Sequence, residues 1–247
     1  MFAKNAIRFA TWGALSLGLV AGLSAEENTP AKAAGGTISG KALFDGAVPE
    51  AGKLTIDKDM EVCGKRDATD KSLLVGKNKG IKNVVISIKK IDAPDDWKGE
   101  GKTAEFDQVN CEFTTRVLVI PVDSSVELKN SDPVLHNVHT YSRRNTPINQ
   151  GIPASQTLTK KFDAAETVQV TCDVHKWMKA WIVVADHPWY SLTSEDGSFE
   201  LKDVPPGEYE IVAWHEELGK SKTKHKDVVV KAGETTKGID FEFKPKK

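Results

Sequence analysis

The sequence predicts an all-β protein. Short apolar runs rich in Val, Ile and Phe recur along the chain, and Gly, Pro, Asp and Asn separate them, which is the pattern of strands and turns. No long window has the 3.6-residue spacing of apolar positions that an amphipathic helix of useful length needs. With 247 residues, the chain is long enough for one large or two small domains.

The N-terminus (residues 1–25) has the features of a secretory signal peptide. Lys4 and Arg8 form a charged start, and residues 9–23 are apolar but too short and too interrupted by Gly and Ser for a membrane span. We therefore expect cleavage at the end of this segment and a periplasmic or secreted protein, with a retained N-terminal anchor as the alternative. Residues 26–36 are polar, which indicates a flexible leader. No later segment is apolar enough to span a bilayer.

Six strands are expected between the leader and the middle of the chain. The runs that predict them are residues 37–44, 83–88, 116–122, 126–130, 158–162 and 167–172. Residues 36–82 carry no motif of their own. We expect them to be an N-terminal elaboration, in the form of an extra hairpin, on a domain that spans residues 37–186.

A second unit is expected at residues 187–247. A turn at 193–199 leads into a strand, and a Pro-Pro-Gly turn is followed by alternating apolar and polar residues. Its Asp-Gly-x-Phe and Pro-Pro-Gly-x-Tyr strings resemble those of the carboxypeptidase regulatory-like domain, a small β-sandwich, which implies a packing or partner role. Adjacent His215 and Glu216 face opposite ways on a strand, and Asp196 lies in no calcium-binding spacing. We therefore expect no second site.

The most informative stretch is Cys172-x2-His175-x2-Met178, which places a thiolate, an imidazole and a thioether within seven residues. One Cys, two His and a long axial Met suit a copper ion that cycles between Cu(I) and Cu(II). Upstream, His136 ends an apolar run and is followed by Asn137. Any one of these residues alone is more often core packing or a satisfied polar group. Their combination at this spacing indicates a copper site.

This combination resembles the cupredoxins, the type 1 blue copper proteins, and among them the amicyanin-like and plastocyanin-like members. The short Cys-x2-His-x2-Met loop and the His-Asn-Val-His string are shared with amicyanin. The resemblance implies a Greek-key β-sandwich over residues 37–186 with one copper per chain. The implied ligands are His136, Cys172, His175 and Met178, and Asn137 is implied to tie the two ligand loops together. His139 lies three residues from His136 on an extended segment, so it faces away and is left out.

The resemblance implies an electron carrier rather than an enzyme. Four protein ligands leave no open metal position for a substrate, and we find no set of nucleophile, base and orienting residue in the sequence. The expected partner is a transient redox protein, reached through His175 and an apolar patch. Candidates for that patch are Pro133, Leu135 and Trp177. Lys176 and Trp177 stand where the family loop has Pro and Phe. This difference bears on the identity of the redox partner more than on copper binding.

Cys63 and Cys111 are the thiols that remain once Cys172 is given to copper. In an oxidising compartment we expect them to form a disulfide, which would fasten the N-terminal elaboration to the sandwich near Cys111. Two inert buried thiols are the alternative.

The chain has 34 basic and 35 acidic residues, a net charge of −1, which gives no reason to expect nucleic acid or an anionic membrane as a partner.

Two other classes of function stay open. A copper storage or delivery protein would need readily exchanged metal. A structural two-domain β protein would carry a copper motif that no longer binds. A tight, intensely coloured and redox-reversible copper species would distinguish the carrier from both.

Overall fold

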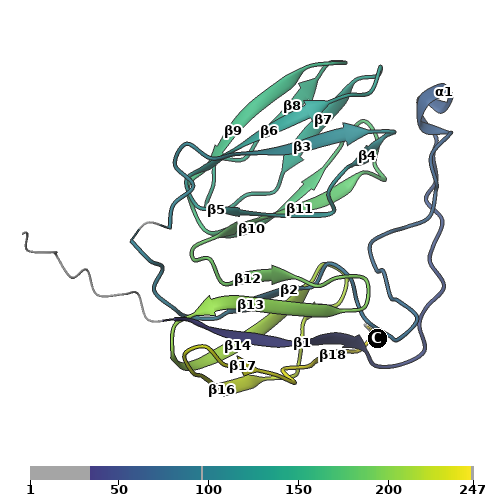
Figure 1. Cartoon of the computed structure of the whole chain (residues 1–247). Coiled ribbons are helices and arrows are strands. Elements are labelled where there is room, and N and C mark those ends of the chain that lie inside the picture. The colour runs from purple at the N-terminus through teal and green to yellow at the C-terminus, as the bar shows by residue number, and fades with distance from the viewer. Residues whose placement is uncertain (1–33, 96, 246–247) are drawn as a thin grey trace, which may run out of the picture. The chain divides into compact units, whose positions relative to one another are not determined.

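The computed structural model describes residues 34–95 and 97–245, so the expected signal peptide (1–25) and most of the leader (26–36) lie outside the described residues. Within the described residues, the only helix is α1 (Met60–Cys63), a single turn, and all other regular elements are strands. The predicted all-β sandwich class is confirmed (Figure 1). No helix in this part of the chain has the length and apolar character that a membrane crossing requires.

The first sandwich carries the candidate metal ligands. One sheet consists of β5 (Val117–Pro121), β7 (His136–Thr140), β8 (Asn149–Ile152), β10 (Glu166–Thr171) and β11 (Lys179–Ala185). The other consists of β3 (Thr103–Val109), β4 (Glu112–Phe113), β6 (Ser124–Asn130) and β9 (Thr157–Phe162). The strand orders are β5-β11-β10-β7-β8 and β4-β3-β6-β9. Alternate residues such as Leu128 and Val170 point inward and share one core.

The second sandwich also has two sheets. One consists of β1 (Gly36–Phe44), β13 (Ser198–Val204), β17 (Thr235–Thr236) and β18 (Phe241–Phe243). The other consists of β2 (Val85–Ile88), β12 (Tyr190–Leu192), β14 (Gly207–His215), β15 (Gly219–Lys220) and β16 (His225–Val230). Its core is separate from that of the first sandwich, and it includes Phe199, Ile211 and Phe241.

The domain boundaries expected from the sequence differ from this strand pairing. β1 lies between β13 on one side and β17 and β18 on the other, and β2 lies between β12 and β14 (Figure 1). Ile38 and Phe44 of β1 are buried in the second core. β1 and β2 fall in the expected 37–186 domain but complete the 187–247 unit. In sequence, the first sandwich is inserted between β2 and β12. The partners are remote in sequence, so the local pattern could not reveal them.

A loop between β1 and β2 reaches the first sandwich. This capping loop (residues 53–69) is closed at its base by a bridge between Lys53 and Thr69, and it carries α1, which lies beside β4 in Figure 1. Ile56 and Val62 of the loop pack against the first core. The capping loop therefore takes the place of the extra hairpin that the sequence led us to expect.

The two sandwiches share a small apolar cluster and a buried ion pair. Val85 of β2 packs with Val117 and Val183 of the first sandwich. Beside them, the carboxylate of Glu216, with its side chain 2% exposed, accepts hydrogen bonds from Arg116 Nε at 2.5 Å and Nη2 at 2.7 Å. A carboxylate buried this deeply depends on its cationic partner.

Candidate metal centre

The strand register brings the two ligand segments together. His136 is the first residue of β7 and Cys172 directly follows β10. These strands are antiparallel, with Thr171 paired to His139, so the start of β7 lies beside the end of β10. The turn between β10 and β11 is closed by hydrogen bonds from Met178 N to His175 O (2.9 Å) and from Cys172 N to Met178 O (3.3 Å).

Three predicted ligands converge. His136, Cys172 and His175 are 0%, 1% and 0% exposed, and a donor atom of each lies within 4.8 Å of the other two. The two Nδ1 atoms are 2.8 Å apart, and Cys172 Sγ is 4.0 Å from Nδ1 of His136 and 3.8 Å from Nδ1 of His175. This is a His2Cys cluster, enclosed within the first core.

The surroundings of Cys172 hold the sulfur in place. Its Sγ accepts the backbone N–H groups of Asn137 and His175, both at 3.4 Å. The Asn137 side chain spans the two segments, because its Oδ1 accepts N–H groups from Asp173 (2.5 Å) and Val174 (3.3 Å) in the ligand turn. Asn137 therefore lies where the sequence resemblance placed it, tying β7 to the loop that carries Cys172.

Two carboxylates that the sequence reasoning missed complete the imidazole environment. His136 Nε2 lies 2.8 Å from Asp132 Oδ2, and His175 Nε2 lies 2.8 Å from Asp59 Oδ2. Burial lowers the pKa of His136 below its ordinary value, although the hydrogen bond to Asp132 opposes this effect. The lowered pKa favours the neutral ring that a metal needs. Asp132 stands four residues before His136, a spacing that could have signalled its role.

The donor atoms fit one metal ion. A carboxylate at Nε2 keeps the proton of a neutral imidazole there and leaves the lone pair on Nδ1. Two such lone pairs facing each other across 2.8 Å repel unless a proton or a cation lies between them. In the plane of the three donors, a point about 2.0 Å from each Nδ1 lies about 2.2 Å from Cys172 Sγ, and both lengths are ordinary for a metal bound to imidazole and thiolate. A trigonal His2Cys set of this kind is typical of copper.

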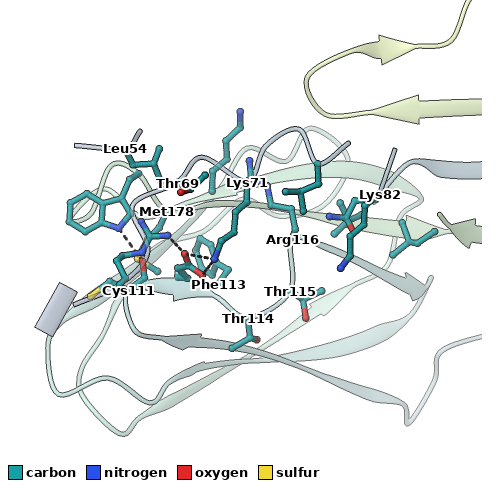
Figure 2. Close-up of a pocket in the computed structure, with 18 residues that line it drawn as sticks. Leu54, Thr69, Lys71, Lys82, Cys111, Phe113, Thr114, Thr115, Arg116 and Met178 are labelled. Carbon is teal, nitrogen blue, oxygen red and sulfur yellow. Dashed lines mark hydrogen bonds and ion pairs between the residues drawn. The ribbon is translucent and has the colours of Figure 1, made fainter. Parts of the chain in front are cut away.

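Met178 is buried beside this cluster. Its side chain is 2% exposed, in the same core as Cys172. It also lines a pocket of about 420 Å³ whose other walls include Trp177 and several cationic side chains. Figure 2 shows Cys111 and Met178 at one end of this pocket and Lys82 at the other. The backbone of Met178 is held in the ligand turn by the hydrogen bonds to His175 and Cys172.

The predicted disulfide is present. Cys63, in α1 of the capping loop, is bonded to Cys111 between β3 and β4. Both sulfur atoms lie within 4.8 Å of a ring nitrogen of His175, and Cys111 Sγ lies equally close to donor atoms of Asp132 and His136. Cys172 is a free thiol. The disulfide therefore lies against the His2Cys cluster, a proximity that no sequence motif predicts.

The remaining predicted residues fall outside the cluster. His139 Nδ1 lies 3.0 Å from Asp173 Oδ1, and its ring stacks on Tyr141. This hydrogen bond is the largest cause that lowers the pKa of Asp173 below its ordinary value, followed by the hydrogen bond from Asn149. In the second sandwich, His215 is buried near Phe243, whereas the neighbouring Glu216 turns to Arg116.

The expectation that His175 forms an exit to the surface is wrong. Its side chain is 0% exposed, because Asp59 of the capping loop covers Nε2 and Trp177 packs against the ring, with centroids 5.1 Å apart. Among the patch candidates, Leu135 is 51% exposed and Pro133 is exposed, but Trp177 is half-buried and donates a hydrogen bond to the backbone oxygen of Cys111.

Comparisons with known proteins give partial similarities. A family model described as polysaccharide lyase family 4, domain II, matches residues 167–238. The comparisons therefore do not support the carboxypeptidase regulatory-like domain expected from the sequence, and the matched region begins within β10, before the expected boundary. No curated protein matches the sequence significantly.

Several solved structures resemble part of the chain. A copper-containing nitrite reductase from Thermus scotoductus SA-01 is 21% identical, with a TM-score of 0.33, over 34% of this chain and 22% of the reductase chain, so about a fifth of that protein is spanned. A purple cupredoxin from Nitrosopumilus maritimus is 19% identical, with a TM-score of 0.30, over 33% of this chain and 99% of its own. A Cu(I) form of an amicyanin variant is 20% identical, with a TM-score of 0.31, over 40% of this chain and 98% of its own.

Proposed function

We propose that this chain is a type 1 copper protein that carries single electrons between redox proteins, and that it does so in the periplasm or outside the cell. The observation that carries the proposal is the buried convergence of His136, Cys172 and His175 at distances that suit one metal ion. The proposed location depends on the sequence of residues 1–25.

Each residue of the cluster has a distinct part in this function. Cys172 would supply the thiolate, and its two backbone N–H contacts withdraw charge from the sulfur. His136 and His175 would supply the imidazoles, and Met178 the weak axial thioether. Copper held by these groups would provide a one-electron couple. We propose no catalytic reaction, because four protein ligands would leave no position for a substrate.

Burial favours a carrier over a storage or delivery protein. Cys172 and both imidazoles are at most 1% exposed, and a disulfide and a loop lie over them. Delivery requires a metal that exchanges readily, which an enclosed ligand set opposes. A fixed set of donors instead suits electron transfer, because the geometry then changes little between Cu(I) and Cu(II).

A visible absorption spectrum tests the proposal. The protein given one equivalent of Cu(II) should show an intense thiolate-to-copper charge-transfer band and one reversible one-electron wave in voltammetry. Cys172→Ser should lose the band. His139→Ala is the matched control, because His139 pairs with Asp173 and lies outside the cluster, and it should keep the band. Stoichiometric copper without colour in the wild type would rule out the type 1 assignment.

A further inference from the structure

Both imidazoles of the cluster are held from behind by a carboxylate. Asp132 and Asp59 each lie 2.8 Å from the Nε2 atom of their own histidine. Such contacts fix the orientation of a ligand ring and increase its basicity toward the metal. The two carboxylates come from different parts of the chain, one from the turn between β6 and β7 and the other from the capping loop.

Asp132 is fixed by backbone groups at the turn between β3 and β4. Its Oδ1 accepts the N–H of Asn110 and its Oδ2 accepts the N–H of Cys111, both at 2.7 Å. These two donors belong to successive residues with φ of 54° and 56°, a left-handed conformation that turns both N–H groups to one side. Cys111 therefore anchors Asp132, which in turn holds His136.

Asp59 is fixed through α1. Its backbone oxygen accepts N–H groups from Val62 (2.9 Å) and Cys63 (2.8 Å), which closes the single helical turn. The disulfide then joins Cys63 to Cys111. A four-residue helix on an exposed loop has little stability of its own, so the disulfide is the covalent constraint that holds Asp59 against His175, beside the packing of Ile56 and Val62.

The contacts form a closed ring around the metal cluster. From His175 it passes through Asp59 and α1 to the disulfide, and from Cys111 through Asp132 to His136. One covalent bond thus joins the supports of both imidazoles. Nothing in the ligand spacing of the β10–β11 turn requires this arrangement.

We propose that Asp59 is a positioning residue for the metal ligand His175, and that the Cys63–Cys111 disulfide holds it there, so that the properties of the copper centre depend on a loop outside the ligand sandwich. This inference rests on the proposed copper function. The negative carboxylate favours Cu(II) over Cu(I), because it strengthens donation from the ring and adds charge opposite to that of the ion.

The test compares Asp59→Asn with Asp57→Asn. Asn tolerates the left-handed backbone of residue 59, where φ is 48°, so the loop can keep its conformation. Asp57 is an exposed carboxylate of the same loop and controls for the loss of one charge. We expect Asp59→Asn to weaken Cu(II) binding about 10- to 100-fold with little effect on Cu(I). At about 59 mV per tenfold change, the reduction potential rises by roughly 59 to 118 mV.

Two further measurements separate positioning from a general structural effect. In the metal-free wild type, nitrogen-15 NMR should find His175 protonated at Nε2 with a slowly exchanging proton, and Asp59→Asn should accelerate that exchange. The double variant Cys63→Ser, Cys111→Ser should shift the potential in the same direction as Asp59→Asn, because the loop is released.

Each outcome decides one question. Equal potentials and equal proton exchange in Asp59→Asn and Asp57→Asn would overturn the positioning role of Asp59. A double serine variant with the wild-type potential and proton exchange would overturn the role of the disulfide. Failure of the wild type to form a coloured copper species would instead refute the proposed function, and the metal-free NMR comparison would still decide whether Asp59 orients the ring.

Discussion

Ile38→Ala tests the assignment of β1 to the second sandwich. Ile38 is 0% exposed and lies between Leu201 of β13 and Thr236 of β17. The substitution removes three buried carbons, which at about 0.8 kcal/mol each gives a transfer loss of about 2.4 kcal/mol. Hydrogen-bonded strands on both sides keep the site from collapsing, so the remaining cavity should bring the total to about 3 to 5 kcal/mol.

The assay combines urea unfolding with hydrogen exchange read by mass spectrometry. Ile38→Ala should lower the unfolding midpoint and increase exchange at 198–215 and 239–243, which contain β13, β14 and β18. Exchange within 117–185 should rise much less, because that segment belongs to the other core. Val48→Ala is the matched control, since Val48 is 47% exposed and its truncation should change stability by no more than about 0.5 kcal/mol.

Two results would refute this reasoning. If Ile38→Ala and Val48→Ala unfolded at the same urea concentration, the burial of Ile38 would not contribute to stability. If the gain in exchange fell mainly within 117–185, β1 would belong to the sandwich that holds the His2Cys cluster, as the sequence first suggested.

Two further predictions concern charged groups. Arg116→Met should lower the free energy of unfolding in urea by about 3 to 5 kcal/mol, because it leaves the buried Glu216 carboxylate without its main partner. Adding Glu216→Gln should recover most of this loss. Wild-type stability of Arg116→Met alone would contradict the prediction. Burial raises the pKa of Glu166, but hydrogen bonds from the backbone N–H groups of Arg143, Arg144 and Asn145 and from the Asn145 side chain together hold the pKa below its ordinary value. The Glu166 carboxylate should therefore stabilise the fold above the unfolded pKa near 4.5 and lose that effect as the pH falls through the lower folded pKa. The difference in unfolding free energy between wild type and Glu166→Gln should accordingly disappear in acid. A difference that does not change with pH would contradict this explanation.

Local features of the fold could be predicted from the sequence because strands leave a local pattern. The expected runs 37–44 and 158–162 correspond to β1 (Gly36–Phe44) and β9 (Thr157–Phe162). The pairing of these strands could not be predicted, since β1 meets partners that lie more than 150 residues away. The alternation of apolar residues defines which face is buried but not against which sheet.

The site shows the same division. Cys172 and His175 share one turn, so their spacing carries the chemistry, and the Asn that follows His136 indicated the link between the two segments. Asp59 gave no such signal, because its approach to His175 depends on the disulfide and on a loop with no motif. For the same reason the exposure of His175 was predicted incorrectly.

The interrupted second sandwich sets an order for chain synthesis. β1 emerges first, but its partners β13, β17 and β18 are made last, after the whole first sandwich. Until β13 and the core residues around it have been made, Ile38 and Phe44 have no complete core to enter, and β1 presents unpaired edges of the kind that template aggregation. A nascent chain must therefore keep β1 apart while the first sandwich folds, and a chain released before β18 would leave residues 42–44 of β1 without their partner strand on that side.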